Sequence, residues 1–296
     1  MRGARQLVQL LRLLGEMNDL PDNRLDSLRR SLLAGLCATA FGAVALFGVL
    51  VPLPVLLLVT PPAKRPRRVR GLASVGFRIL IRMIEGSGLA RIELEGTESL
   101  AIEGRLLVAN HPSYLDAVFL MAYFPHVNCV MKPALLNHPL FFPFARLGGY
   151  IADSEQSPLK LVESCRAAAA RGDTILIFPE GTRTTPGIPM RFRRGTAQIA
   201  LRAELPIVPV VILCDPPALT HGRPWYRMPG KRVRLVIRFQ PSRAATDFAE
   251  GPPSALPRVA RQVTRGLENY FITQLASMDH ESLPLSSPLP PASKGP

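Results

Sequence analysis

The feature that most constrains the fold is a long stretch without a single charge, residues 31 to 63. As a helix it is longer than the roughly 20 apolar residues needed to cross a bilayer, so we expect it to insert into a membrane. Pro52 and Pro54 interrupt it; they would kink a spanning helix or turn the segment into a re-entrant hairpin, and the sequence leaves both open. The stretch begins too far along the chain, and lacks a clear cleavage site, for a signal peptide.

Basic residues flank this stretch on both sides. Two of them precede it (Arg29 and Arg30), and a denser cluster follows it: Lys64, Arg65, Arg67, Arg68 and Arg70. Because cytoplasmic flanks carry the excess of Lys and Arg, we expect residue 64 onward to lie in the cytoplasm. Residues 1 to 30 combine leucines at helical spacing with arginines, as in an amphipathic helix that lies on a membrane or packs on the protein. Residues 1–70 are therefore assigned to membrane anchoring.

The net charge of the chain limits the classes of partner that it is expected to bind. A net charge of +14 indicates contact with a polyanion, either nucleic acid or an anionic membrane. Aromatic residues make up only 6% of the chain, which leaves few stacking platforms for single-stranded nucleic acid. Because the basic residues also adjoin the apolar stretch, we expect membrane lipids as partners and no nucleic acid.

The cysteines point to a reducing compartment. Cys37, Cys129, Cys165 and Cys214 lie far apart and show neither a CxxC pair nor Cys/His ligand spacing. We expect buried or membrane-facing thiols rather than disulfides or zinc ligands.

Beyond Gly71 short apolar strands alternate with helices, which predicts an α/β domain with a mixed or parallel sheet over residues 71–245. The expected strands are 91–95, 106–109, 127–131, 174–178, 207–213 and 232–239. The expected helices are one that Ser113 caps and that runs through 117 to about 123, most of 133–147, 158–171 and 195–203. A C-terminal helix is expected within residues 246–282, and the Pro/Ser-rich residues 283–296 are expected to be disordered.

The first candidate site follows the apolar strand 106–109. Pro112 disfavours helix for the residue before it, and Ser113 can cap the next helix, so His111 lies at a strand-to-helix corner. Asp116, one turn inside that helix, can reach back to the imidazole, fix its tautomer and leave the other ring nitrogen free as a general base. The same spacing is also a capping box, which needs no catalytic purpose.

A second candidate site follows the strand 174–178. Gly181 allows close backbone approach, and the N–H groups of Gly181 and Thr182 could donate to an oxyanion or phosphate. Arg183 offers a two-pronged donor for phosphate, and Arg193 and Arg194 precede a helix N-terminus. The alternative is an ordinary turn at Glu180 followed by solvated arginines.

Together the two blocks resemble the glycerolipid acyltransferase family, the 1-acylglycerol-3-phosphate (lysophosphatidate) acyltransferases and their relatives. The H-x4-D block of that family is matched by His111 and Asp116, and its F-P-E-G-T-R block is unaltered at residues 178–183. A later apolar segment with a proline is matched at residues 205–211. The resemblance covers about residues 75–240.

The resemblance implies a membrane-bound enzyme with its catalytic domain on the cytoplasmic face. His111 would deprotonate the acceptor hydroxyl, which attacks the thioester of acyl-CoA or acyl-carrier protein directly, and Asp116 would orient His111. Glu180, with Gly181 and Thr182, would line the acceptor site and help hold its geometry. Arg183 would bind the acceptor phosphate, with Arg193 and Arg194 as further candidates. The acceptor implied is 1-acylglycerol-3-phosphate, giving phosphatidate. No acyl-enzyme, metal or cofactor is expected beyond the thioester co-substrate.

One block departs from the pattern of the family. Where phosphate-using members show an arginine after a glycine, residues 147–154 place Asp153 and Ser154, and the stretch after Lys132 lacks the acid often present there. A lyso-aminolipid or lyso-glycolipid therefore stays open as the acceptor.

Two other function classes remain as alternatives. A Ser-His-Asp lipid hydrolase would use similar residue types, but the chain has no G-x-S-x-G elbow. A non-enzymatic basic membrane scaffold would tolerate replacement of His111 and Glu180 and would depend on the cluster at 64–70.

Overall fold

The computed structural model describes residues 24–97, 103–137, 141–153, 157–185, 187–220, 222, 224, 227–249 and 255–280. The expected amphipathic helix is therefore described only from residue 24 onward, and the expected disordered tail lies outside the described residues.

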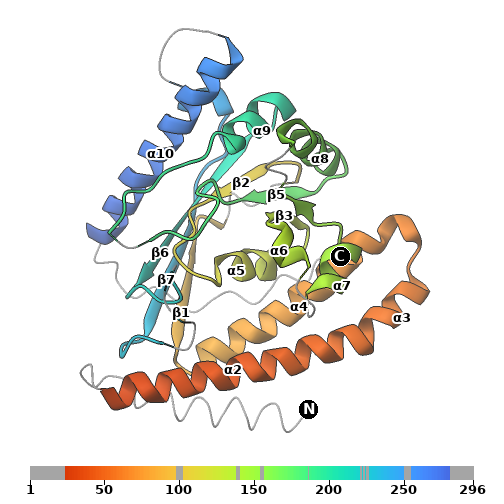
Figure 1. Ribbon diagram of the computed structural model, residues 1–296, viewed down its shortest axis with the longest axis vertical. Helices are drawn as coiled ribbons and strands as arrows, with labels where there is room; N and C mark the ends of the chain where they lie inside the picture. Colours follow the sequence, from red (N-terminus) through yellow and green to blue (C-terminus); the bar gives the residue numbers. More distant parts are fainter. Residues whose placement is uncertain are drawn as a thin grey trace.

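The sheet has seven strands in the order β1-β7-β6-β2-β5-β3-β4 (Figure 1). Their bounds are β1 Ala90–Glu95, β2 Leu106–Ala109, β3 Val127–Met131, β4 Ile151–Ala152, β5 Thr174–Ile177, β6 Ile207–Asp215 and β7 Val233–Phe239. All neighbours pair in parallel except β6 and β7, which are antiparallel. The expected mixed-sheet α/β fold is thus confirmed, and only the two-residue strand β4 had no counterpart among the expected strands.

Helices cover both faces of the sheet. They are α2 Arg24–Leu50, α3 Pro52–Val59, η1 Pro62–Lys64, α4 Arg65–Gly86, α5 Asp116–Tyr123, α6 Pro133–Leu136, α7 Phe142–Leu147, α8 Pro158–Ala170, α9 Gly195–Ala203, η3 Ala245–Phe248 and α10 Leu256–His280. Alternate residues of β2 enter opposite cores: Leu107 and Ala109 pack with α3, α4, α5 and α7, whereas Leu106 and Val108 pack with α8, α9 and α10. The central strands are buried on both faces, which explains their unbroken apolar sequence.

The uncharged stretch forms most of a helical hairpin. Leu25–Val59 is long and apolar enough to cross a membrane by length and composition, and little of it is buried. Pro52 and Pro54 interrupt the helix only at Val51 and do not reverse the chain; the reversal comes later, around η1, after which α4 returns along α2 and α3 (Figure 1). Large apolar side chains on the outer face remain exposed, Leu58 at 85%.

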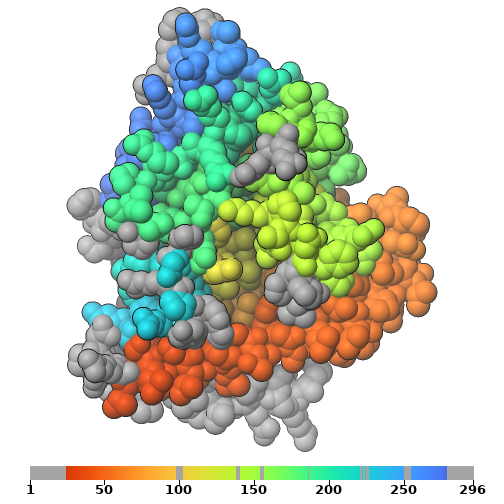
Figure 2. Space-filling view, in the orientation of Figure 1, coloured from red at the N-terminus to blue at the C-terminus, as the bar shows by residue number. Residues whose placement is uncertain are grey.

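The hairpin is fastened to the sheet domain along its length. The buried Arg30 of α2 donates hydrogen bonds to the carbonyls of Gly230 (3.0 Å) and Gly88 (3.2 Å). At the other end, Leu53 enters the core beneath the sheet. Figure 2 shows α2 as a red-to-orange strip along one side of the molecule. The anchoring segment and the sheet domain therefore form one packed unit.

Helix α4 was not anticipated from the sequence. It passes without a break through the boundary expected between residues 70 and 71. Its buried Arg70 donates to the carbonyl of Gly148 and pairs with the carboxylate of Asp173, which also accepts a hydrogen bond from the Asn128 amide. This network lies where β3, β4 and β5 begin, at the sheet edge opposite the strand ends that carry the candidate site.

Candidate active site

Four parallel strands end side by side at one edge of the sheet. The pairs Val108–Ile177, Cys129–Leu176 and Met131–Ala152 place the ends of β2, β5, β3 and β4 in a row. His111, Glu180, Lys132 and Asp153 follow these four strands in that order. Ligands of open α/β sheets bind outside the carboxyl ends of the strands, so the two motifs converge where such a site is expected.

His111 and Asp116 form the expected pair. The imidazole Nδ1 lies 2.8 Å from Asp116 Oδ2, and the same oxygen accepts a hydrogen bond from the Ser113 backbone N–H at 2.7 Å. One detail differs from expectation: Asp116 is the first residue of α5 rather than one turn inside it, and Leu115 rather than Ser113 is the cap residue. The carboxylate therefore bridges the turn and the ring at once.

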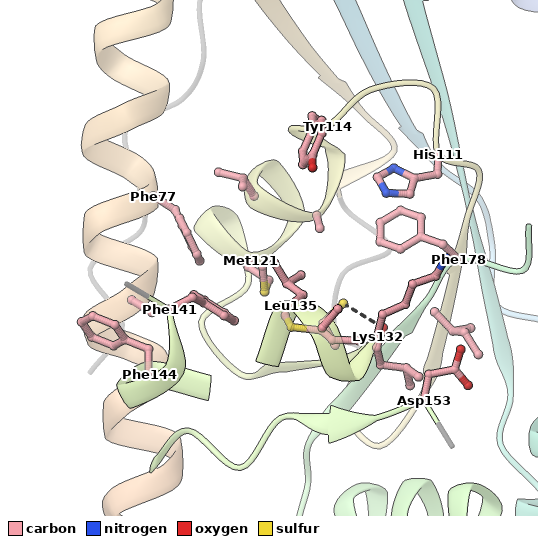
Figure 3. A pocket seen from close by; sticks show the side chains of 18 of the residues that line it. Phe77, His111, Tyr114, Met121, Lys132, Leu135, Phe141, Phe144, Asp153 and Phe178 are labelled. Carbon is pink, nitrogen blue, oxygen red and sulfur yellow. Dashed lines mark hydrogen bonds between the residues drawn. The ribbon is translucent and has the colours of Figure 1, made fainter. Parts of the chain in front are cut away.

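The environment of the pair suits a general base. Asp116 is 0% exposed, and burial raises the pKa of its carboxyl while the hydrogen bond from His111 opposes that rise. The imidazole stacks on the Phe178 ring, with 4.1 Å between centroids. Because Nδ1 is held by Asp116, Nε2 is the nitrogen left for a substrate proton, and His111 lines a cavity (Figure 3).

Glu180 holds the backbone of the catalytic turn. Its Oε1 accepts hydrogen bonds from the His111 N–H (2.9 Å) and from the Thr184 hydroxyl (2.8 Å). Thr184 in turn donates its backbone N–H to the carbonyl of His111 at 2.7 Å. Burial raises the pKa of Glu180, and its side chain is not among those that line the cavity. Glu180 therefore holds the geometry around His111, as the resemblance implied, but its side chain lies behind the His111 turn and not in the cavity wall.

Thr184 is the contact that the sequence analysis missed. It stands immediately after the second motif, and nothing in the local pattern distinguishes its hydroxyl from that of Thr185. Only the pairing of β2 with β5 brings it against His111.

Gly181 and Thr182 both line the cavity, but only one offers a backbone donor. The Gly181 N–H already donates to the carbonyl of Phe178 at 3.0 Å, contrary to its expected role toward an oxyanion. Within the described chain the Thr182 N–H has no such partner. Gly181 has φ +65°, and the Arg193 guanidinium lies directly over it.

We expect Gly181→Ala to cost about 1–2 kcal/mol of stability from the left-handed backbone alone. The added methyl would also lie 2.5 Å from Arg193 Nε, so the Arg193 side chain would have to move out of its place in the cavity wall. Thermal unfolding and acyl-transfer rate should fall together. Gly187→Ala is the matched control, since that glycine has φ +81° with nothing within 4 Å of the added atom. Equal activity losses in both variants would contradict the role given to Arg193.

The three arginines differ in their placement. Nη1 of Arg183 donates to the carbonyls of Leu219 and Thr220, both at 3.1 Å, and its guanidinium lies 3.9 Å above the Tyr114 ring. Arg183 thus holds the β6–β7 connection over the site, with only its other N–H groups left for an anion. Arg193 and Arg194 are both exposed, and of the two only Arg193 lines the cavity.

The cavity itself is large and mostly apolar. It has a volume of about 1080 Å³ and extends from the strand ends to the helical hairpin. Its apolar wall includes Phe41 of α2, Phe77 of α4, Met121 of α5 and Phe144 of α7, several of which face one another in Figure 3. Sequence reasoning missed these residues because α4 was not expected.

The described cysteines are free thiols, and three of the four are buried. Cys129 lines the cavity, but burial raises its pKa to about 12. At neutral pH it is therefore an unreactive thiol.

Part of the chain is similar to known proteins. Residues 91–213 match the family model described as Acyltransferase. The chain is 31% identical to the 1-acyl-sn-glycerol-3-phosphate acyltransferase of Pseudomonas aeruginosa over 135 residues, 44% of this chain and 51% of that protein. It is also 31% identical to the coconut (Cocos nucifera) enzyme of the same name over 126 residues, 41% of each. The chain thus spans about half the length of the curated relatives it matches.

A solved structure shows the same fold over nearly the whole described chain. The crystal structure of the 1-acyl-sn-glycerophosphate (LPA) acyltransferase PlsC from Thermotoga maritima matches with a TM-score of 0.63 at 17% identity, covering 86% of this chain and 98% of that one. The two motif blocks, the family model and the fold agree: residues 91–213 are similar to the Acyltransferase family, and the chain shares the fold of a solved 1-acyl-sn-glycerophosphate acyltransferase.

Proposed function

We propose that this protein is a membrane-associated O-acyltransferase that moves a fatty acyl group from a thioester to the free hydroxyl of a lysophospholipid. The observation that carries the proposal is a histidine that lines a long, mostly apolar cavity and whose Nδ1 is held by a buried carboxylate, which leaves Nε2 for the substrate. The names of the relatives make 1-acylglycerol-3-phosphate the first acceptor to test.

The steps of acyl transfer follow from the pairing of His111 with Asp116. His111 Nε2 takes the hydroxyl proton as the acceptor oxygen attacks the thioester carbonyl, and a tetrahedral oxyanion forms. Asp116 stabilises the imidazolium that results, since its Oδ2 lies 2.8 Å from Nδ1. The oxyanion then collapses, the C–S bond breaks, and the imidazolium returns the proton to the thiolate that leaves. Positioned general-base catalysis of this kind contributes about 10²–10⁴-fold.

Donors for the oxyanion come from the second motif. Thr182 lines the cavity, and its N–H has no partner in the described structure. Arg183 lines the same cavity and has N–H groups that are not bound to the β6–β7 connection. Preorganised donors of this type act most strongly in a site from which water is excluded.

The apolar outer face of the hairpin supports insertion into one leaflet. Helix α2 packs along α4 and is tied to the sheet domain through Arg30, so it lies alongside the domain rather than projecting from it. In that orientation the cavity opens at the bilayer surface, where both lipid substrates partition. The basic cluster at residues 64–70 favours the cytoplasmic face, with its anionic lipids.

The apolar part of the cavity is proposed to hold an acyl chain, and Gly76 tests this. Gly76 lines the cavity and has nothing within 4 Å of an added Cβ, so Gly76→Phe would fill the space that the chain occupies. Excluding two methylene groups forfeits about 1.6 kcal/mol. We therefore expect more than a tenfold shift in kcat/KM from palmitoyl toward lauroyl donors.

Gly71→Phe is the matched control for this substitution. Gly71 belongs to the same helix and also has open space, but it does not line the cavity. Its chain-length preference should equal that of the wild type. An unchanged preference in Gly76→Phe would show that the chain binds elsewhere.

The experiment that tests the proposed function uses purified full-length protein in detergent micelles with radiolabelled palmitoyl-CoA or palmitoyl-acyl-carrier protein. Each donor is incubated with and without lysophosphatidate or another lysophospholipid, and the products are separated. An acylated acceptor supports the proposal. Release of free palmitate regardless of acceptor would indicate a hydrolase, and no turnover with any pair would favour the membrane scaffold.

A further inference from the structure

The strand ends beside His111 carry a carboxylate that the proposed mechanism does not use. Asp153 directly follows β4 and is only partly exposed; its backbone N–H donates to the carbonyl of Met131 at 2.7 Å. Its side chain lines the same cavity as His111. Within the described part of the chain, this carboxylate has neither an ion pair nor a hydrogen-bond donor. It is therefore fixed at the site and still available to a ligand.

A lysine lies next to this carboxylate without neutralising it. Because Met131 pairs with Ala152, Lys132 and Asp153 leave adjacent strands at the same level. Both line the cavity, and the described structure has no ion pair between them. The ends of β3 and β4 thus present one cation and one anion side by side. A phosphate alone would gain from the lysine and be repelled by the carboxylate, whereas a head group with both charges complements both.

The spacing from the catalytic base suits such a head group. In the sheet, β5 and β3 separate β2 from β4. Three strand spacings of about 4.8 Å put Asp153 roughly 14 Å from the strand that carries His111. Figure 3 shows His111, Phe178, Lys132 and Asp153 in succession along one side of the pocket. The phosphate and the ammonium of phosphoethanolamine lie about 5 Å apart, close to one strand spacing, so the phosphate can lie near Lys132 and the ammonium at Asp153 on the adjacent strand. The glycerol of the acceptor then lies between that phosphate and His111.

We propose that Asp153 selects an acceptor whose head group carries a primary ammonium beside its anion, so that the preferred acceptor is a zwitterionic lyso-aminolipid rather than lysophosphatidate. This inference rests on the proposed acyl transfer and narrows its acceptor. Asp153 accepts hydrogen bonds from the ammonium, and Lys132 binds the phosphate or carboxylate of the same head group.

The test is a competition between two acceptors in one enzyme sample. The fraction of folded enzyme then affects both rates equally and cancels from their ratio. Full-length protein in mixed micelles with palmitoyl-CoA acylates equal amounts of lysophosphatidate and lysophosphatidylethanolamine of one acyl chain. We expect wild type to favour the ethanolamine lipid at least tenfold in kcat/KM. Asp153→Asn should reduce that ratio by about tenfold or more, because only this acceptor loses a charge-assisted hydrogen bond. Lysophosphatidylcholine, whose quaternary nitrogen cannot donate, should be a poorer acceptor than the ethanolamine lipid.

Two variants serve as controls. Glu163→Gln removes an exposed acid of α8 that does not line the cavity. Its preference for the ethanolamine lipid over lysophosphatidate should equal that of wild type. Lys132→Gln should slow both acceptors together, since both carry a phosphate. A wild-type preference for lysophosphatidate, or an unchanged ratio in Asp153→Asn, would overturn the inference while leaving the proposed reaction intact. Failure of wild type to acylate either lipid would overturn the proposed function and the inference with it.

Discussion

Replacing His111 with alanine is expected to lower the rate of acyl transfer by about 10²–10⁴-fold, the contribution of a positioned general base. The substitution removes the group that accepts the hydroxyl proton and leaves the cavity otherwise unchanged. The rate is measured as labelled acyl lipid formed from a thioester donor at saturating acceptor. Because the loss lies in the chemical step, kcat should fall while the apparent affinity for both substrates stays near that of wild type.

His126→Ala is the matched control for this prediction. That histidine is also partly exposed and accepts a hydrogen bond from Arg67 Nε, but it lies outside the cavity. Its transfer rate should equal that of wild type. Asp116→Asn should lose activity through the orientation of the ring, although the amide still fits the turn. A wild-type rate in His111→Ala would exclude the base mechanism, whatever the other variants did.

Most of the sheet could be predicted from the sequence because its strands are short apolar runs that end at turn residues. Leu106–Ala109 and Val127–Met131 were predicted to the residue, as was the helix Gly195–Ala203. Strand β4 has only two residues, Ile151 and Ala152. A run that short carries no period, so only its pairing with β3 makes it a strand.

Helix α4 could not be predicted with the same reasoning. The helix begins within the basic cluster of residues 64–70, and such a cluster is typical of the flank of a membrane segment. In the structure, Arg70 is buried and the apolar residues after it, among them Phe77 and Ile81, pack on the core beneath the sheet. Without α4, neither the hairpin nor the apolar wall of the cavity could be placed.

The candidate site, like the fold, could be predicted from the sequence only in part. The pairing of His111 with Asp116 is local, five positions apart, and its geometry follows from a strand, a turn and a helix start. The roles of Glu180 and Arg183 depend on which strands are neighbours, since their partners are His111 and the β6–β7 connection. Sequence reasoning could identify these residues as important. It could not tell that one supports the base from behind and the other holds a loop.

Breaking the buried pair of Arg70 and Asp173 is expected to cost about 3–5 kcal/mol of stability, the effect of leaving one buried charge without its partner. The two side chains are 3% and 6% exposed. Burial lowers the pKa of Arg70, but an arginine remains charged at any physiological pH. Arg70→Met therefore leaves the Asp173 carboxylate buried without its cation, with the Asn128 amide as its only side-chain donor among the described residues. Chemical unfolding of purified protein in a single detergent measures the change.

Arg67 provides the comparison within the same helix. It pairs with Glu103, but the two side chains are 47% and 72% exposed, and exposed pairs contribute about 0–1 kcal/mol. Arg67→Met should therefore unfold almost as wild type does. Similar losses in Arg67→Met and Arg70→Met would show that helix propensity or overall charge, and not burial of the ion pair, determines the effect.

The double variant Arg70→Met/Asp173→Asn distinguishes two contributions to the free energy of unfolding: the net stabilisation by the ion pair, and the destabilisation by a buried charge without a partner. Arg70 Nε and Asn128 Oδ1 have no hydrogen-bond partner among the described residues, so the network is incompletely satisfied even in the wild type. Replacing both charged partners removes the stranded charge, and such replacements are often nearly neutral. We therefore expect the double variant to be more stable than Arg70→Met, with a coupling energy that offsets most of the loss. If the losses of Arg70→Met and Asp173→Asn simply added in the double variant, the two side chains would not stabilise each other, and the stranded charge would not explain the loss in Arg70→Met.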